Sequence, residues 1–195
     1  MSDGTPRAPR RMRVDAAENR ARVLVAAKAV FTEHGARASL NEVAKRAGVG
    51  SGTLYRHFPS LQALLVAIIS EDVEKLCERG RDLMTQHDAD TALLRWLRAF
   101  ASHASAMQGL LATQLAVEFV PGDGNALAAC HDAILSTGAA LLDRSKREGS
   151  TPPDTGIRDV LRLANAIAWA SQQAPEDTNL IDRLFAISLG APPRA

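Results

Sequence analysis

The stretch from Ser39 to Phe58 constrains this chain most, because it combines two short helical patterns with a glycine corner between them. Ser39 is a favourable helix N-cap, and Glu42 three residues later completes a capping box. Apolar residues then recur at helical spacing on one face, at Leu40, Val43, Ala44 and Ala47. Gly48 is expected to end this helix, because glycine takes the left-handed conformation without steric cost.

A second short helix is expected after the corner, with Val49 filling the corner and Leu54 and Phe58 forming the buried side. Its other residues are small or polar: Gly50, Ser51, Gly52, Thr53, Tyr55, Arg56 and His57. Such a front suits the major groove of DNA, where glycine permits close approach and polar side chains reach phosphates or base edges. The stretch therefore predicts a helix-turn-helix.

These residues resemble the DNA-binding domain of the TetR family of bacterial transcriptional regulators. The resemblance starts near Ala17 and continues through Leu24, Ala27, Phe31 and Glu33-His34-Gly35. It is densest in two runs, residues 43–49 and 52–59. It implies that Tyr55 and His57 contact phosphates. It also implies a wider DNA-binding set, with base contacts from Ser51, Thr53 and Arg56, phosphate neighbours at Lys45 and Arg46, and supporting positions at Ser39, Gly50 and Gly52.

Two positions depart from the family pattern. The family often has Ser or Thr at the position of Gly50, so that Ser51 either caps the second helix or contacts DNA. The family usually has a phosphate-binding Lys where this chain has Leu61. Both departures keep an alternative open, in which an all-helical binding protein uses its helix-turn-helix to contact another protein. A steep salt dependence of DNA binding would separate the two.

Charge is divided unevenly along the chain. Residues 1–60 contain 11 Lys and Arg against 5 Asp and Glu, whereas residues 61–195 contain 12 against 17. A basic N-terminal part fits a polyanionic partner such as DNA. Residues 1–14, rich in Arg and Pro, are expected to form a flexible basic arm, either a minor-groove contact or a solvated tail.

The remaining pattern predicts an all-α chain with two domains. Residues 15–60 form the DNA-binding domain, and residues 61–195 form a helical effector-binding and dimerisation domain that begins with a linking helix at 61–84. Residues 85–90 are expected to form a loop. A further helix is expected through the apolar stripes from Leu93 to Met107, with a break at Gly109 before residues 110–120. Others are expected at about 125–147, 157–173 and 176–189, with loops at 121–124 and 148–156.

The last two helices are expected to join two copies of the chain in a four-helix bundle. The proposed pairing faces are Val160, Leu161, Ala164, Ile167 and Ala168 on one helix, and Leu180, Leu184, Ile187 and Ser188 on the other. Packing of these faces in a single protomer's core is the alternative. A dimer fits the need of helix-turn-helix proteins to contact two half-sites about 34 Å apart, or a multiple of that distance.

The C-terminal part also resembles the SbtR-like branch of TetR regulators, around Leu93-Leu94-Arg95-Trp96-Leu97, Leu141 to Gly149 and Ile157 to Trp169. Polar residues near apolar stripes suggest a small-molecule site, with ordinary core packing as the alternative. The candidate ligand-binding residues are Trp96, Phe100, His103, Met107, Gln114, Phe119, Asn165 and Trp169. The expected function is a ligand-responsive repressor, released from a palindromic operator by a largely apolar effector.

Enzymes and cofactor proteins are disfavoured, because no catalytic or phosphate-binding motif is present and the five histidines are scattered. No catalytic residues, metal site or cofactor are expected. Cys77 and Cys130 are expected to be separate thiols in a reducing cytoplasm. The chain has no apolar run of about 18 residues, so we expect no membrane span and place the protein at the nucleoid.

Overall fold

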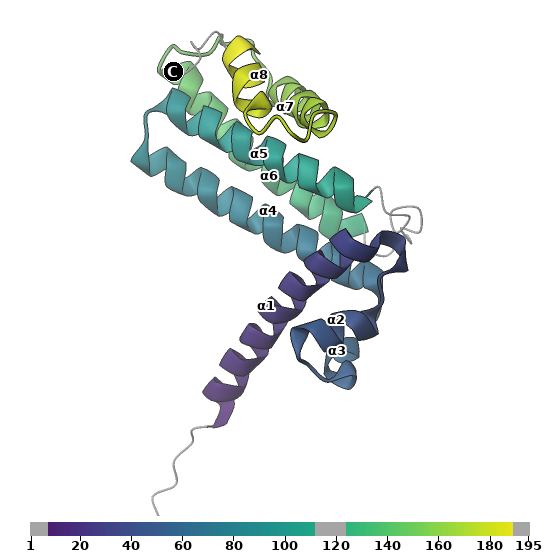
Figure 1. Ribbon diagram of the computed structural model, residues 1–195. Helices are drawn as coiled ribbons and strands as arrows, with labels where there is room; N and C mark the ends of the chain where they lie inside the picture. The colour runs from purple at the N-terminus through teal and green to yellow at the C-terminus, as the bar shows by residue number, and fades with distance from the viewer. Residues whose placement is uncertain (1–7, 112–123, 189–195) are drawn as a thin grey trace, which may run out of the picture. The chain divides into compact units, whose positions relative to one another are not determined.

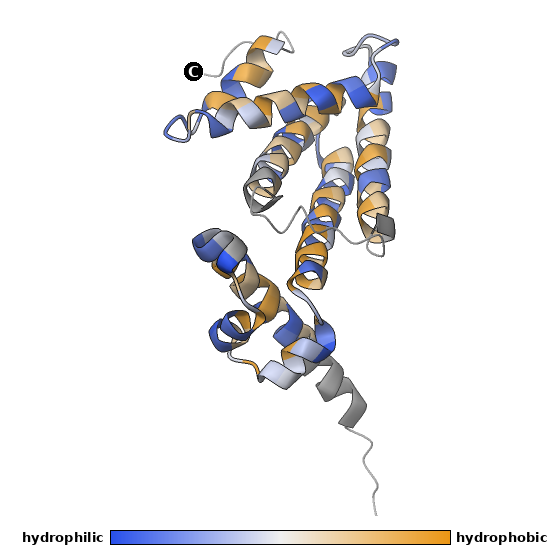
Figure 2. Ribbon diagram, turned by 90° about the vertical axis from the view of Figure 1, so that its right-hand side faces the viewer, coloured by the Kyte–Doolittle hydropathy of each residue, from blue (hydrophilic) through white to orange (hydrophobic). Residues whose placement is uncertain are grey.

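The computed structural model describes residues 8–111 and 124–188, and their regular structure is entirely helical (Figure 1). This agrees with the predicted all-α fold. The elements are α1 (Ala8–His34), the short 3-10 helix η1 (Gly35–Arg37), α2 (Leu40–Ala47), α3 (Ser51–His57), α4 (Leu61–Gln86), α5 (Ala89–Leu111), α6 (Gly124–Arg147), α7 (Ile157–Gln172) and α8 (Leu180–Ser188). Hydrophobic and hydrophilic residues are interspersed along most of these helices, as expected for helices with one buried stripe (Figure 2).

The described residues form two compact units. The N-terminal unit comprises the described residues up to Ile68 together with Leu110 and Leu111, and the C-terminal unit comprises Ile69–Gly109 and the described residues from 124 onward. The boundary between them falls inside α4. In the N-terminal unit, α1, α2, α3 and the first turns of α4 share one core, whose fully buried members include Ala27, Val30, Phe31, Val43, Leu54, Leu64 and Ile68.

The start of α1 differs from the prediction of a flexible arm over residues 1–14. The helix begins at Ala8, and therefore includes Arg10, Arg11 and Arg13. Pro9 lies in the first turn, where the absence of its N–H leaves no helical hydrogen bond unmade. Arginine and alanine are favourable helix formers, so nothing in this segment opposes extension of the helix. The prediction for residues 1–7 lies outside the described residues.

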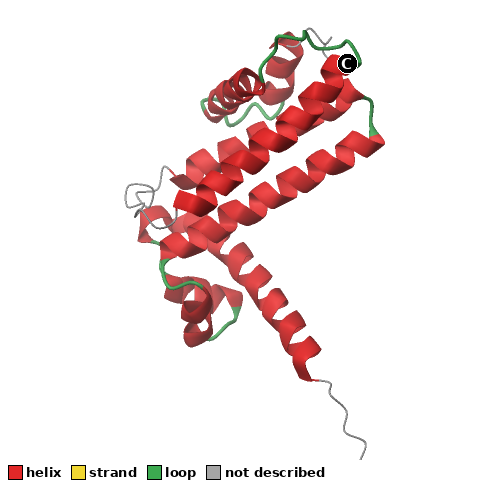
Figure 3. Cartoon of the chain, turned by 180° about the vertical axis from the view of Figure 1, so that it is seen from behind, coloured by secondary structure: helices red, strands yellow, loops and turns green. Residues whose placement is uncertain are grey.

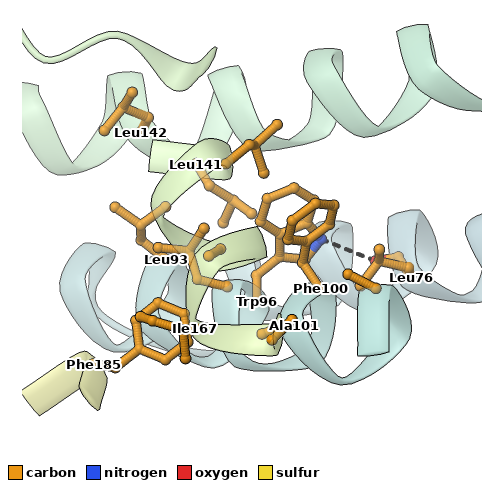
Figure 4. Packing of buried hydrophobic residues seen from close by; sticks show 14 of the residues in the cluster. Leu76, Leu93, Trp96, Phe100, Ala101, Leu141, Leu142, Ile167 and Phe185 are labelled. Carbon is orange, nitrogen blue, oxygen red and sulfur yellow. Dashed lines mark hydrogen bonds between the residues drawn. The ribbon is translucent and has the colours of Figure 1, made fainter. Parts of the chain in front are cut away.

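In the C-terminal unit, the later part of α4 lies beside α5 and α6, and α7 and α8 form a hairpin at one end of these three helices (Figures 1 and 3). The core contains Leu76, Leu93, Trp96, Leu97, Phe100, Leu141, Leu142 and Phe185 (Figure 4). It also contains Leu161, Ala164, Ile167 and Ala168 of α7. The α7 face that was predicted to pair with a second copy is therefore buried in the protomer's own core.

Trp96 occupies a slot between α4 and α6. Its indole Nε1 donates a hydrogen bond to the carbonyl oxygen of Leu76, 3.1 Å away (Figure 4). A Cβ atom built on Gly80 would lie 3.0 Å from the indole, and one built on Gly138 would lie 2.9 Å from it. Thr137 Cγ2 would lie closer still to a Cβ atom at position 80, and Ile157 Cδ1 would lie 2.8 Å from one at position 138. All these distances are shorter than ordinary van der Waals contact, so the indole ring and these two side chains together require glycine at both positions. Phe100 stacks on the ring with a centroid separation of 6.0 Å.

A polar cluster fastens the α4–α5 turn to the end of α6. The buried Ser145 Oγ lies 2.9 Å from Asp90 Oδ1 and 2.6 Å from Thr151 Oγ1. Arg144 Nη1 donates to the carbonyl oxygen of Met84, and Glu148 Oε2 accepts from the N–H of Ala89. These bonds satisfy backbone groups at the end of α4 and the start of α5, where the helices supply no partner of their own.

Several predicted boundaries were wrong. The break predicted at Gly109 is absent, because α5 continues through it to Leu111. The loop predicted at residues 85–90 is confined to His87 and Asp88, because Asp88 Oδ1 accepts from the N–H of Thr91 and caps α5. The last helix begins at Leu180, not at residue 176. The preceding residues form turns in which the Asp177 carboxylate accepts from the guanidinium of Arg183, which also lowers the pKa of Asp177. The predicted loop at 121–124 lies outside the described residues, except that Gly124 begins α6.

The Trp96 slot gives a stability prediction. Gly138→Ala is expected to lower the free energy of unfolding by about 1–3 kcal/mol, because the added methyl group overlaps Ile157 Cδ1 and the indole ring. Gly52→Ala is the matched control: no atom lies within 4 Å of its added Cβ, and its stability should stay equal or rise by up to about 1 kcal/mol. Urea denaturation measures both. Wild-type stability of Gly138→Ala would show that the ring is not confined.

Candidate nucleic-acid interface

The first helix of the predicted helix-turn-helix is α2, and local contacts set its two ends. The hydroxyl of Ser39 accepts a 3.2 Å hydrogen bond from the N–H of Glu42, as the capping pattern predicted. At the other end, Gly48 has a φ of 66°, a left-handed conformation that favours glycine. The N–H of Val49 then bonds to the carbonyl oxygen of Ala44, 3.1 Å away, and closes the corner.

The second helix, α3, is buried along one edge only. Leu54 is its one buried residue, and Phe58, directly after it, is buried in the same core. Ser51, Gly52, Tyr55, Arg56 and His57 are exposed, and Thr53 is half-buried. Tyr55 is 45% exposed. The residues predicted to contact DNA therefore form a polar outer face on α3.

Gly50 is the N-cap of α3, so Ser51 is the first helical residue and does not cap it. Gly50 has a φ of −65°, which any residue adopts, and an added Cβ would meet nothing closer than 3.9 Å. Around Gly52 nothing lies within 4 Å of an added Cβ. The folded chain therefore does not require glycine at either position, in contrast to Gly80 and Gly138.

The cations on α2 differ in their contacts. Lys45 is exposed, as a phosphate-binding residue would be. Arg46 is also exposed, but its guanidinium makes two hydrogen bonds to Glu33 at the end of α1, Nη1–Oε1 at 2.7 Å and Nη2–Oε2 at 2.8 Å. These bonds lower the pKa of the Glu33 carboxyl and raise the pKa of Arg46. The pairing of Arg46 with Glu33 was not predicted from the sequence.

Leu61 stands where the resembling family has a lysine. It is half-buried and packs against the core of the N-terminal unit, as Val49 and Ala67 also do. Ser60 caps α4, because its hydroxyl accepts a 3.0 Å hydrogen bond from the N–H of Ala63. The first turn of α4 therefore has a packing role at this position, and the side chain there supplies no cation.

The predicted ligand-binding residues are not all brought together. Trp96, Phe100 and Met107 are buried on α5, and His103 is half-buried on the same helix. The indole N–H of Trp96 is already bonded to Leu76, so the ring is part of the core. Asn165 and Trp169 lie on the exposed face of α7, and the Trp169 side chain is 60% exposed. Gln114 and Phe119 lie outside the described residues.

Two further features of the described residues bear on function. No group of three or more His, Cys, Asp or Glu side chains among them could hold a metal ion. Within the same residues, no helix is both long and apolar enough to cross a membrane.

The sequence contained a signal for the Trp96 slot, since Gly80 and Gly138 each interrupt an otherwise helical pattern.

Comparison with known proteins places both units. Residues 23–68 match the model described as bacterial regulatory proteins of the tetR family, and residues 88–190 match the C-terminal domain of SbtR-like transcriptional regulators. Two curated relatives match over the N-terminal part. The transcriptional regulator SAB2452 of Staphylococcus aureus (strain bovine RF122 / ET3-1) is 34% identical over 43% of this chain and 46% of its own length. UidR of Escherichia coli K12 is 40% identical over 36% and 37%, so that less than half of either relative is covered.

Solved structures match over more of the chain. The TetR transcriptional regulator SCO0520 of Streptomyces coelicolor is 33% identical, with a TM-score of 0.73 over 90% of this chain and 99% of that one. A TetR regulatory protein from Mycobacterium vanbaalenii is 32% identical, with a TM-score of 0.68 over 83% and 97%. The SbtR-like model alone spans more than half of the sequence. The chain therefore belongs to the TetR family of bacterial transcriptional regulators.

Proposed function

We propose that the protein is a ligand-responsive repressor that binds a palindromic operator as a homodimer and leaves it when a small, largely apolar effector binds. The observation that carries the DNA-binding part is the outer face of α3. Its polar residues are exposed, while the helix is held from behind by Leu54 and Phe58. If α3 enters the major groove of DNA, this face presents hydroxyl, imidazole and guanidinium donors to the phosphates and base edges.

The glycines of α3 support a close approach of the partner. The fold leaves room for a side chain at Gly50 and at Gly52. A substitution there is therefore expected to disturb binding without disturbing folding. In the alternative function, in which α3 contacts a protein, the glycines would also permit close approach, but the binding affinity would not depend strongly on salt concentration. Log-affinity that falls linearly with log salt concentration, at a slope near −0.9 for each phosphate contacted, supports DNA.

We also propose that the DNA-binding domain comprises residues 15–60 and that residues 61–195 bind the effector and form the dimer. The helix at 61–84 then links the two, and the boundary between the compact units falls inside α4. An effector that prefers one conformation of the C-terminal unit would shift the spacing of the two α3 helices through this helix. The bacterial cytoplasm, at the chromosome, is where such a regulator would act.

For the dimer we propose the outer face of α7 and α8, in place of the α7 face that is buried in the core. Leu163 and Trp169 are exposed on α7, and Ile187 is 77% exposed on α8. Leu163, Ala166 and Trp169 recur every three residues and form one stripe. Large apolar side chains gathered on one hairpin mark an interaction surface, because scattered exposure is ordinary and clustered exposure is not.

For the effector we propose contacts in the C-terminal half of the described part of α5, at His103 and Met107. Trp96 is excluded from this proposal, because its ring and its N–H are committed to the core. His103→Ala is expected to change the effector concentration that releases half of a labelled operator, and to leave operator affinity without effector unchanged. A screen of apolar compounds for operator release supplies the effector. An unchanged half-release concentration would remove His103 from the site.

The interface on α3 gives a prediction about specificity. With an operator selected from random DNA, Tyr55→Phe should weaken binding to all sequences alike, because a phosphate contact carries no sequence information. Arg56→Ala should cost roughly 1–3 kcal/mol and relax preference at one base position. Fluorescence anisotropy at low salt measures both. If neither substitution changes affinity, the outer face of α3 is not the interface.

The dimer surface has a matched control on another helix. Ile187→Glu should dissociate the dimer, because it places a charge in an apolar interface, and operator affinity should fall with it. Val25→Glu changes an equally exposed apolar residue of α1, 71% exposed, and should leave the dimer intact. Sedimentation at several protein concentrations distinguishes the two. A dimer that survives Ile187→Glu would place the interface elsewhere.

A further inference from the structure

One ion pair and one histidine–carboxylate contact cross from the end of α1 to α2 on the solvent side of their shared core. Glu33 binds Arg46 through two parallel hydrogen bonds of 2.7 and 2.8 Å. The next residue of α1, His34, places Nε2 2.8 Å from Glu42 Oε1. Glu42 and Arg46 are four residues apart and therefore share one face of α2. Each helix thus contributes one acid and one base at this edge.

The order of these charges fixes one alignment of the two helices. The apolar contacts of α2 come from Leu40, Val43, Ala44 and Ala47, which are short or branched side chains and non-directional in their packing. If α2 moved by one turn along α1, Glu42 would approach Glu33, and the two carboxylates would repel. Guanidinium–carboxylate pairs with two parallel bonds are also strongly directional. These polar contacts therefore specify orientation where the apolar contacts do not.

We propose that Glu33 and Arg46 are a positioning pair that sets the angle of the helix-turn-helix for DNA binding, and that Arg46 acts through Glu33 and not on a DNA phosphate. The inference rests on the proposed DNA-binding function. Arg46 lies two residues before Gly48, so its link to α1 holds the C-terminal end of α2. Because α3 follows directly from that corner, a change in the angle of α2 is passed on to every side chain of its outer face.

Exposure of the pair separates this role from a structural one. The Arg46 and Glu33 side chains are 40% and 48% exposed, and ion pairs at such positions add little to global stability. Removal of the pair should therefore leave the urea midpoint almost unchanged. The directional constraint that this pair adds is lost, however, and a misplaced interface loses binding energy at every contact.

A double-mutant cycle with a salt titration tests the proposal. Glu33→Gln and Arg46→Gln should each weaken operator binding by about 3- to 10-fold, and the double variant should be no weaker than either single one. The salt slope should stay at the wild-type value in all three. Lys45→Gln is the control: removal of a phosphate contact at the neighbouring residue reduces the slope by about one. Arg46→Lys keeps the charge but loses the two parallel bonds, and should bind as weakly as Arg46→Gln.

The opposite pattern would overturn the proposal. If Arg46 bound a phosphate, Glu33→Gln would free it and leave affinity equal or higher, Arg46→Gln would reduce the salt slope by about 0.9, and Arg46→Lys would retain most of the binding. Affinities equal to wild type in both single variants would also exclude a positioning role. If the wild-type protein shows no salt-dependent binding to any DNA sequence enriched from random DNA, the proposed DNA-binding function is wrong. That result is distinct from a failure of the positioning role.

Hydrogen exchange on the free protein tests separately, without DNA, whether the pair holds α2 against α1. Loss of the pair should speed exchange of backbone amides in residues 40–57 by several-fold and leave α5 and α6 unchanged, because only the α1–α2 link is released. Equal exchange in wild type, Glu33→Gln and Arg46→Gln would show that the pair does not hold α2 in place.

The pair also has a definite pH dependence. Hydrogen bonding from Arg46 lowers the pKa of Glu33, with the charges of Arg46 and His34 acting in the same direction. The stabilisation is therefore fully present above the ordinary carboxyl pKa and is lost as the pH falls through the lowered pKa of the folded state. The exchange difference between wild type and Arg46→Gln, measured at matched intrinsic rates, should persist at pH 6 and shrink toward pH 3. A difference that stays constant over this range would point to a cause other than the carboxylate.

Discussion

A seven-residue helix is not stable in water by itself, and the presentation of α3 depends on the burial of two side chains behind it. Isolated helices need about 12–15 residues before their hydrogen bonds offset the cost of nucleation. In this chain, Leu54 and Phe58 supply the missing free energy by packing against α1, α2 and the start of α4. Because they lie on one side, everything opposite them is left exposed. The one-sided burial of α3 is therefore both the source of its stability and the reason for its accessible polar face.

The helices α1 and α2 support α3 and set its orientation. Both helices are packed on their inner sides by small and medium apolar residues, among them Ala27, Val43 and Ala44, that let the helices approach closely. Their outer edges are tied together by Glu33, Arg46 and the neighbouring pair of His34 and Glu42. A core that holds α3 firmly and an edge that orients it would together make a rigid interface. Rigidity of this kind matters to a regulator whose two copies must fit a duplex at one spacing.

Local rules predicted the parts of the fold that depend on neighbouring residues. The cap at Ser39, the left-handed corner at Gly48 and the start of α4 after Ser60 were all predicted correctly from residue type and spacing, since each is made by contacts within a few positions. The all-helical architecture followed from periodicity in the same way. The start of α8 was wrong because Asp177 bonds to Arg183 and favours a turn, an arrangement that apolar spacing alone does not indicate.

Contacts between distant segments were beyond such rules. Trp96 and Phe100 were predicted as ligand-binding residues, because a Trp among apolar stripes has the same pattern in a pocket as in a core. What distinguishes the two is Gly80 on one side and Gly138 on the other, and neither is near Trp96 in sequence. The partner of Arg46 was missed for the same reason, since Glu33 lies on another helix, 13 residues away. Two predicted site residues, Gln114 and Phe119, lie outside the described residues.

The indole slot has a consequence for how this chain can diverge from its relatives. Gly80, Gly138 and Trp96 share a volume with Thr137 and Ile157, so a gain of side-chain atoms at position 80 must be matched by losses at 96 and 137, and a gain at 138 by losses at 96 and 157. Substitution at any one of the three is penalised until another has changed, and the three positions should therefore be inherited together. In an alignment of the family, a branch with side chains at both glycine positions should carry a smaller residue in place of the tryptophan.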